Sequence, residues 1–187
     1  MDGMELLQQV ERTKSEFGSK CPRKYAGALA VTLFRGTLKA LGIPVSPRDV
    51  FIKGVPVEID LLVPRAGSRP DNCILYQPQD VLVAFEIKNT GVFGQGAVNA
   101  IRKNFQIIRR EAPHIQCYYV TLTEKKTYKW AVNSEKLGFP AYTLTLYSES
   151  KGKTSYEPTD DWQKLLCDLS VVCCKTIKNW GTRIDVG

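Results

Sequence analysis

The sequence predicts one α/β domain with a mixed β-sheet flanked by helices. Two observations support this fold class. Several segments carry apolar residues at helical spacing, and the short segments between them are apolar and β-branched, as strands are. A chain of 187 residues is also long enough for one hydrophobic core and short for two. We therefore expect a single domain over 1–187.

Helical patterns come first along the chain. Residues 1–20 are charged and helix-prone, which suggests a short docking helix. Residues 22–41 carry an apolar stripe at helical spacing and are followed by Gly42, a residue type that commonly ends helices. We expect a helix over 22–41.

Strand patterns follow this helix. Two apolar runs, 50–53 and 55–63, are separated by Gly54 alone, which predicts a hairpin. The segment 65–73 has the glycine, proline, asparagine and aspartate content of an exposed loop. Residues 81–89 are almost continuously apolar as far as Phe85, so we expect a central strand that is covered on both faces.

The second half of the chain continues the alternation of helices and strands. A glycine-rich exit at 90–96 leads into it. The elements expected from periodicity are, in order, a helix over 97–110, a strand over 116–123, a helix over 125–137, a strand over 141–148, a solvated loop over 151–159 and a final amphipathic helix from Asp160.

Composition narrows the classes of function. A formal net charge of +7 favours a polyanionic partner such as nucleic acid. The six cysteines form no CxxC pair, so neither a zinc site nor a compact disulfide framework is expected. His114 is the single histidine, which removes the main reagent of Ser-His and Cys-His hydrolases. We expect His114 to be a surface residue.

The chain shows neither a secretory leader nor a membrane span in its sequence. The N-terminal residues include acids and no apolar stretch of the kind that secretory signals carry. No apolar run approaches the length of a transmembrane helix. We therefore expect an intracellular protein, cytoplasmic or nuclear, with no membrane partner.

Charged residues interrupt the two most apolar strand patterns. Glu58 and Asp60 lie two residues apart on the first run, and Glu86 and Lys88 lie two apart on the second. Residues two apart share one face of a strand, so neighbouring strands would bring three carboxylates and one amine together. Buried like charges repel unless a cation neutralises them, and this pattern therefore favours a divalent metal.

These residues carry a family resemblance. VEIDLLV followed by VAFEIKNTG resembles the motif of the PD-(D/E)xK nuclease superfamily, which has the restriction-endonuclease-like fold. Asp60 matches the first metal-binding acid, Glu86 the second and Lys88 the motif lysine, although no proline precedes Asp60. The resemblance implies an αβββαβ core over about 22–123, with peripheral C-terminal elements over 124–187.

The resemblance implies a Mg²⁺-dependent endonuclease that hydrolyses DNA phosphodiester bonds, restriction-like or junction-resolving, and that acts as a homodimer. The expected metal ligands are Asp60, Glu86 and the carbonyl of Ile87, with Mn²⁺ as an alternative ion. Lys88 is expected to orient or help deprotonate the attacking water and to stabilise the anionic transition state. Many members add an acid from the first helix; 22–41 has none, and of Glu16 and Glu58 we favour Glu58.

Basic and polar residues after the motif are the expected contacts to DNA phosphates. They lie on the helix that follows Lys88. The residues are Gln95, Arg102, Lys103, Arg109 and Arg110. Further recognition elements are expected in 125–153 and in the N-terminal 20 residues.

Two other interpretations remain open from the sequence. The first is a nucleic-acid-binding or assembly module that keeps the nuclease fold without catalysis. The second is an unrelated α/β interaction domain, which predicts no metal binding and no convergence of Asp60 with Glu86. The structural alternative for the charged residues themselves is an exposed sheet face on which Glu86 and Lys88 form ordinary cross-strand ion pairs. Both interpretations differ from the nuclease interpretation because they predict that Lys88 takes no part in cleavage.

Overall fold

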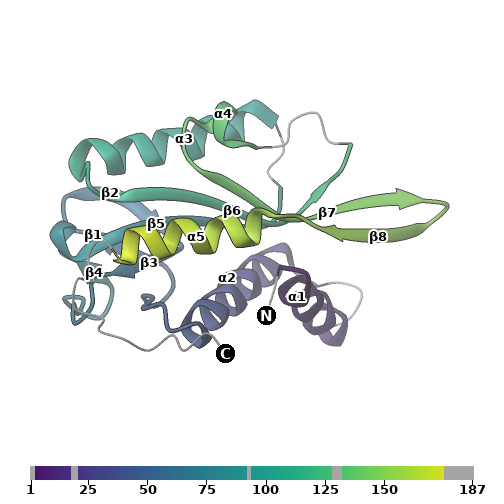
Figure 1. Ribbon diagram of the computed structural model, residues 1–187, viewed down its shortest axis with the longest axis horizontal. Helices are drawn as coiled ribbons and strands as arrows, with labels where there is room; N and C mark the ends of the chain where they lie inside the picture. The colour runs from purple at the N-terminus through teal and green to yellow at the C-terminus, as the bar shows by residue number, and fades with distance from the viewer. Residues whose placement is uncertain (1–2, 18–20, 92–93, 128–131, 175–187) are drawn as a thin grey trace.

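A computed structural model describes residues 3–17, 21–91, 94–127 and 132–174 of the chain. Five α-helices and eight strands lie in these ranges (Figure 1). The helices are α1 (Gly3–Phe17), α2 (Arg23–Ala40), α3 (Gly94–Glu111), α4 (Ser134–Leu137) and α5 (Asp161–Cys174). The strands are β1 (Val50–Ile52), β2 (Val55–Ile59), β3 (Leu61–Pro64), β4 (Leu75–Tyr76), β5 (Val81–Thr90), β6 (Gln116–Lys125), β7 (Ala141–Ser150) and β8 (Lys153–Pro158).

The strands form two sheets. The larger sheet has the order β3-β5-β6-β7-β8, in which β5, β6 and β7 are parallel and the outer strands β3 and β8 are antiparallel to their neighbours. The smaller sheet has the order β2-β1-β4. The predicted α/β fold, with a central mixed sheet flanked by helices, is therefore confirmed.

Helices cover both faces of the larger sheet. Figure 1 shows α3 and α4 on one side, and α1, α2 and α5 on the other. On the α2 side, the rings of Phe34, Phe85 and Trp162 meet edge to face, with centroids 5.6 and 6.2 Å from that of Phe34. A second cluster lies between the sheets and α3, whose buried stripe repeats at intervals of three and four residues: Val98, Ile101, Phe105 and Ile108.

Most predicted elements are confirmed. The helix over 22–41 is α2, and the hairpin at Gly54 joins β1 to β2. The central strand over 81–89 is β5, which lies between β3 and β6 and is buried from Val81 to Phe85. The helix expected over 97–110 is α3, which begins three residues earlier, at Gly94.

The strand predicted over 55–63 is wrong as one element. It divides at Asp60 into β2 and β3, which belong to different sheets. Ile59 pairs with Val50 in the small sheet, whereas Leu61 pairs with Phe85 in the large one. Both residues are buried, so the apolar pattern runs unbroken across a change of hydrogen-bonding partner.

Two predictions in the C-terminal third are also wrong. The helix expected over 125–137 is a strand end at Lys125, which pairs with Tyr147, and the short α4 is its only helical part among the described residues. The loop expected over 151–159 contains β8, an exposed strand that pairs with β7 along its length. Both segments are strands because their backbones pair with β7. Polar side chains do not prevent such pairing.

Within the ranges that the structure describes, no helix combines the length and the apolar composition needed to cross a membrane.

Candidate active site

Three of the predicted site residues meet where β5 leaves the sheet core. Glu86 and Lys88 lie on β5, and Asp60 lies in the bend between β2 and β3. The pairing of Leu61 with Phe85 places Asp60 beside Glu86 on the adjacent strand. Phe85 packs in the α2 cluster, so its neighbours Glu86 and Lys88 point to the opposite face, which α3 covers.

Contacts among these groups are short. The Lys88 Nζ atom lies 2.5 Å from Glu86 Oε1 and 3.9 Å from Asp60 Oδ2. The backbone N–H of Ile87 donates to Asp60 Oδ2 at 2.6 Å. The side chains of Glu86, Asp60 and Lys88 are 17%, 24% and 36% exposed, so the cluster is half-buried and open to solvent on one side.

Burial is the main influence on the ionisation of the two acids. Desolvation raises the pKa of Glu86, and the nearby Asp60 carboxylate raises it further. Desolvation likewise raises the pKa of Asp60, while Lys88 and the Ile87 N–H oppose the shift. Burial thus disfavours the charged form of both carboxyls, and the Asp60 carboxylate disfavours the charge of Glu86 in addition.

The pKa of Lys88 is also raised, but burial is not the reason. Burial by itself would lower the pKa of this lysine, but the carboxylates of Glu86 and Asp60 outweigh burial and raise it. The lysine is therefore held as a cation by its two acidic neighbours. The cluster has two potential oxygen ligands for a cation, and one fixed positive charge.

Glu58 does not align with Asp60 on a strand face. β2 ends at Ile59, so the alternation that was expected to place both acids together stops one residue before Asp60. Glu58 is exposed on β2 and has only a minor electrostatic effect on Glu86. Glu16 forms an ion pair with Arg12 on α1, 3.6 Å apart. Among the residues described, no three acids, histidines or cysteines form a group able to hold a metal ion.

Two residues near Asp60 had no signal in the sequence pattern. The backbone N–H of Asp49 donates to the carbonyl of Asp60 at 3.3 Å, and the Asp49 side chain pairs with Arg48 at 3.0 Å. Arg48 also donates to the carbonyl of Ala28 on α2 at 3.0 Å. These contacts join the loop before β1 to both α2 and the bend at Asp60. These contacts depend on the tertiary fold, so no spacing pattern in the sequence indicates them.

No protein-family model matches the chain, and no curated protein sequence matches it either. The chain does match solved structures. The chain shares its fold with NucC.

Three NucC structures illustrate the likeness. The cAAA-bound form of NucC from P. aeruginosa ATCC27853 has 14% sequence identity and a TM-score of 0.58, over 91% of this chain and 88% of that chain. The cAAA-bound form from E. coli MS115-1 has 13% identity and a TM-score of 0.60, over 91% and 89%. The apo form from E. coli MS115-1 has 12% identity and a TM-score of 0.53, over 98% and 94%. Such low identities show the fold alone.

The expected DNA-contacting residues are spread along α3. The helix has 18 residues and is therefore roughly 27 Å long. Gln95 lies in its first turn, where it donates to Asn99 at 2.9 Å, and Lys103 is exposed midway. Arg109 and Arg110 lie in its last turn. Gln95 thus lies at the end of α3 that follows β5, and the two arginines lie at the other end.

Three of these arginines make intramolecular contacts. Arg102 donates to the carbonyls of Lys136 and Leu137, which leaves it half-buried under α4. Arg109 lies over the ring of Phe139, 5.9 Å from its centroid. Arg110 pairs with Glu111 at 2.7 Å. The structure therefore ties Arg102 and Arg109 to the segment around α4.

Proposed function

We propose that this protein is a metal-dependent endonuclease that hydrolyses phosphodiester bonds in DNA. One observation carries the proposal: Asp60, from the bend between β2 and β3, meets Glu86 and Lys88 of β5 at one half-buried position. Carboxylates placed beside a lysine on adjacent apolar strands are costly for stability, which points to function. The resemblance of these three residues to the PD-(D/E)xK motif gives the reaction class, and the net charge of +7 suits a polyanionic substrate.

The residues fit a hard divalent cation such as Mg²⁺. The two carboxyls offer oxygen ligands; burial raises the pKa of both, and the Asp60 carboxylate raises that of Glu86 further, which an added positive charge would relieve. Mg²⁺ retains several waters, so Asp60, Glu86 and the Ile87 carbonyl suffice to hold it. The ion would supply charge neutralisation at the phosphate and a more acidic water.

The protein's own groups have distinct roles in this proposal. The Ile87 N–H fixes one oxygen of Asp60 and so orients the carboxylate. Lys88, held as a cation, is suited to stabilise negative charge that develops on the phosphate oxygens. The direction of its pKa shift favours this role over proton abstraction from water. Glu86 both positions the Lys88 amine and shares the ligand role with Asp60.

Activity on DNA with Mg²⁺ or Mn²⁺ tests the proposal. Lys88→Met removes the charge and keeps the stem, and Asp60→Asn keeps an acceptor for the Ile87 N–H while removing a negative ligand. We expect each to lower cleavage of plasmid, linear and branched DNA at least about a hundredfold, as the loss of one charge-stabilising group does in other enzymes. Chelation of the metal should abolish cleavage.

A matched control variant distinguishes the loss of Lys88 from a general change of surface charge. Lys39→Met changes an exposed lysine of α2 in the same way and should leave cleavage unchanged. The proposal fails if the wild-type protein shows no metal-dependent cleavage, or if Lys88→Met cleaves at the wild-type rate.

The second candidate is a module that binds nucleic acid without cutting it. The close Lys88–Glu86 pair favours it, because a lysine neutralised by its own strand neighbour is also what a purely structural ion pair looks like. This candidate predicts salt-sensitive binding to DNA or RNA that Lys88→Ala leaves intact. We further propose that the protein acts as a homodimer, as restriction-like and junction-resolving members of the superfamily do.

A further inference from the structure

Strands β7 and β8 form a two-stranded ribbon that leaves the body of the molecule. Figure 1 shows both strands running past the helices to a tight turn. Residues 145–150 of β7 pair with residues 153–158 of β8, so each strand of this part is about 20 Å long at 3.4 Å per residue. Lys151 and Gly152 form the turn, and both have a positive φ, as in the commonest two-residue hairpins. We call residues 145–158 the ribbon.

The ribbon adds nothing to the hydrophobic core. Every residue over 149–158 is exposed. Neither of the two hydrophobic clusters that the described residues form includes a residue of the ribbon. Packing within the chain therefore gives no reason for the ribbon to project, and contact with another molecule does.

The unpaired charge of the ribbon is positive and lies at its turn. Glu149 pairs with Lys125 at 2.6 Å, and Glu157 pairs with Lys126 at 2.8 Å, so both acids of the ribbon are neutralised by the neighbouring chain. Lys151 and Lys153 are exposed, and neither forms an ion pair with any residue that the structure describes. A polyanion would thus meet two available lysines at the end of the ribbon.

One face of the ribbon carries hydroxyl groups. Ser148 and Ser155 lie opposite each other, and their Oγ atoms are 2.8 Å apart. Ser150 pairs with Lys153 two residues closer to the turn, so these side chains share the same face. Hydroxyl and lysine side chains are among those that contact phosphates and base edges in complexes with DNA.

The outer edge of β8 discourages pairing with a strand of another protein. Lys153 begins this strand with a charge, and Pro158 ends it without a backbone N–H. Lysine and proline at an edge are both features that protect sheets from edge-to-edge pairing. The side chains of the ribbon are therefore better suited to a partner than its backbone is.

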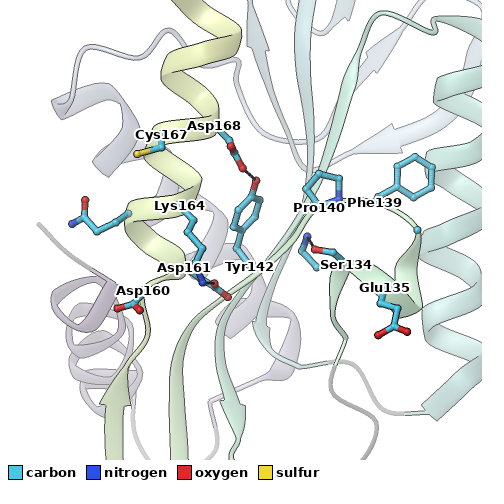
Figure 2. A pocket seen from close by; sticks show the side chains of 13 residues that line it. Ser134, Glu135, Phe139, Pro140, Tyr142, Asp160, Asp161, Lys164, Cys167 and Asp168 are labelled. Atoms are coloured by element: carbon cyan, nitrogen blue, oxygen red, sulfur yellow. Dashed lines mark hydrogen bonds and ion pairs between the residues drawn. The ribbon is translucent and has the colours of Figure 1, made fainter.

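A groove beside α5 is unsuited to a polyanion, in contrast to the ribbon. It has a volume of about 1060 Å³ and lies between α5 and the turn that connects α4 to β7 (Figure 2). Its charged lining residues among those described are Glu135, Asp160, Asp161, Asp168 and Lys164. Lys164 already pairs with Asp161 at 3.1 Å. Phosphates would thus find four acids there and no available lysine.

We propose that the ribbon lies in the major groove of a duplex DNA substrate, with Lys151 and Lys153 on the phosphates and the serine face toward the base edges. The major groove is about 12 Å wide and admits a two-stranded β-ribbon. The inference rests on DNA as the substrate of the proposed function. It adds the duplex form of that substrate and the surface that holds it.

The sheet relates the ribbon to the candidate active site. Lys88 pairs with Thr121 on β6, and Thr121 pairs with Thr143 on β7. Lys151 follows Thr143 by eight residues, which is roughly 27 Å along the strand at 3.4 Å per residue. B-form DNA also advances about 3.4 Å per base pair. One duplex that follows the strands would therefore meet Lys88 and the turn of the ribbon about eight base pairs apart.

Binding without cleavage tests the inference. Fluorescence anisotropy with a labelled duplex of about 20 base pairs, two helical turns, is measured with a chelator present. The ribbon variant is Lys151→Asn with Lys153→Gln, because Asn tolerates the positive φ of the turn. We expect it to bind about tenfold more weakly or worse. The slope of log K against log salt should fall by about 1.8, or about 0.9 for each lost phosphate contact.

A matched variant and a modified duplex are the controls. Lys39→Gln with Lys53→Gln removes two exposed lysines outside the ribbon and should bind as the wild-type protein does. A duplex whose cytosines carry glucosylated 5-hydroxymethyl groups has a filled major groove. The wild-type protein should bind this duplex as weakly as the ribbon variant binds the plain one.

Contrary results are specific. A wild-type protein that does not bind the duplex, or a ribbon variant that binds like the wild type, overturns the inference. Equal binding of the plain and glucosylated duplexes overturns the major-groove assignment. Ribbon-dependent binding by a protein that never cleaves would reject the proposed nuclease activity and keep the ribbon as a DNA-binding surface. Cleavage that the ribbon variant retains in full, with unchanged binding, would reject the ribbon and keep the nuclease.

Discussion

Glu124, at the end of β6, is a buried acid outside the proposed catalytic cluster. It is 3% exposed, accepts a hydrogen bond from the Thr143 hydroxyl at 3.3 Å and packs against the backbone of Gly91. A Cβ atom added at Gly91 would lie 2.6 Å from Glu124 Oε1, so a larger residue where the chain leaves β5 would require the Glu124 carboxyl to move. Desolvation is the main reason why the pKa of Glu124 is raised.

Glu124→Gln should change how stability depends on pH. A raised pKa means that the folded state binds the proton more tightly than the unfolded state. The stabilisation from Glu124 is therefore present below its ordinary value of 4.5 and is lost as the pH rises through the raised pKa. Gln keeps the oxygen that faces Thr143 and carries no charge, so the variant should gain stability relative to the wild-type protein as the pH rises.

Urea unfolding between pH 4 and pH 8 measures this difference. Glu157→Gln on β8 is the control: it removes an exposed ion pair with Lys126 and should stay within about 1 kcal/mol of the wild-type curve. Parallel curves for Glu124→Gln and the wild-type protein would show that burial does not perturb this carboxyl.

At the residue scale, the sequence predicts which three residues lie together at the candidate site and does not predict the residues around them. Charges on apolar strands single out Asp60, Glu86 and Lys88, because such residues are rare on buried strands. Asp49 and Arg48 reach the site through contacts between a loop, α2 and the bend at Asp60, which no local spacing encodes.

Among the elements, β5 and α2 could be predicted best, because burial imposes a regular pattern on both. β8 could not, since all six of its residues are exposed and its strand conformation depends on pairing with β7. The change of sheet at Asp60 was also hidden, because Ile59 and Leu61 are equally buried on either side of it. The spacing of apolar residues indicates which residues are buried. It does not indicate which strand pairs with which.

Phe34→Ala tests how α2 is anchored. The ring is fully buried and contacts the rings of Phe85 on β5 and Trp162 on α5. Its removal leaves a cavity where three elements meet, and we expect a loss of about 3–5 kcal/mol in the free energy of unfolding. Urea denaturation measures the loss.

Tyr156→Ala on β8 is the matched comparison. Tyr156 is partly exposed and its ring lies 6.3 Å from that of Tyr147. Its removal should cost less than about 1 kcal/mol, the range for cross-strand pairs. Equal losses for the two variants would contradict the proposed anchoring of α2 by Phe34.

At the scale of the whole molecule, one sheet joins two hydrophobic clusters. Alternate residues of β5 belong to different clusters: Val83 and Phe85 pack toward α2, and Ala84 packs toward α3. Neither cluster can lose its packing without exposing the back of the strands that support the other. We therefore expect the sheet and both clusters to unfold together.

Urea unfolding followed by two spectroscopic probes tests this expectation. Far-ultraviolet circular dichroism follows the helices and sheet, and tryptophan fluorescence includes Trp162 in the α2 cluster. Both should give the same midpoint in urea, as in two-state unfolding. Separate midpoints would mean that the α2 side and the α3 side are independent units.

The bend at Asp60 is a joint between two sheets. One residue separates β2 of the small sheet from β3 of the large sheet, and that residue carries one of the two carboxyls. The other carboxyl, that of Glu86, is fixed to β5 in the large sheet. The distance between them therefore depends on the angle between the sheets. Substitutions that tilt the small sheet, such as one at Val50, which pairs with Ile59, would change the distance between the two carboxyls without changing any charge.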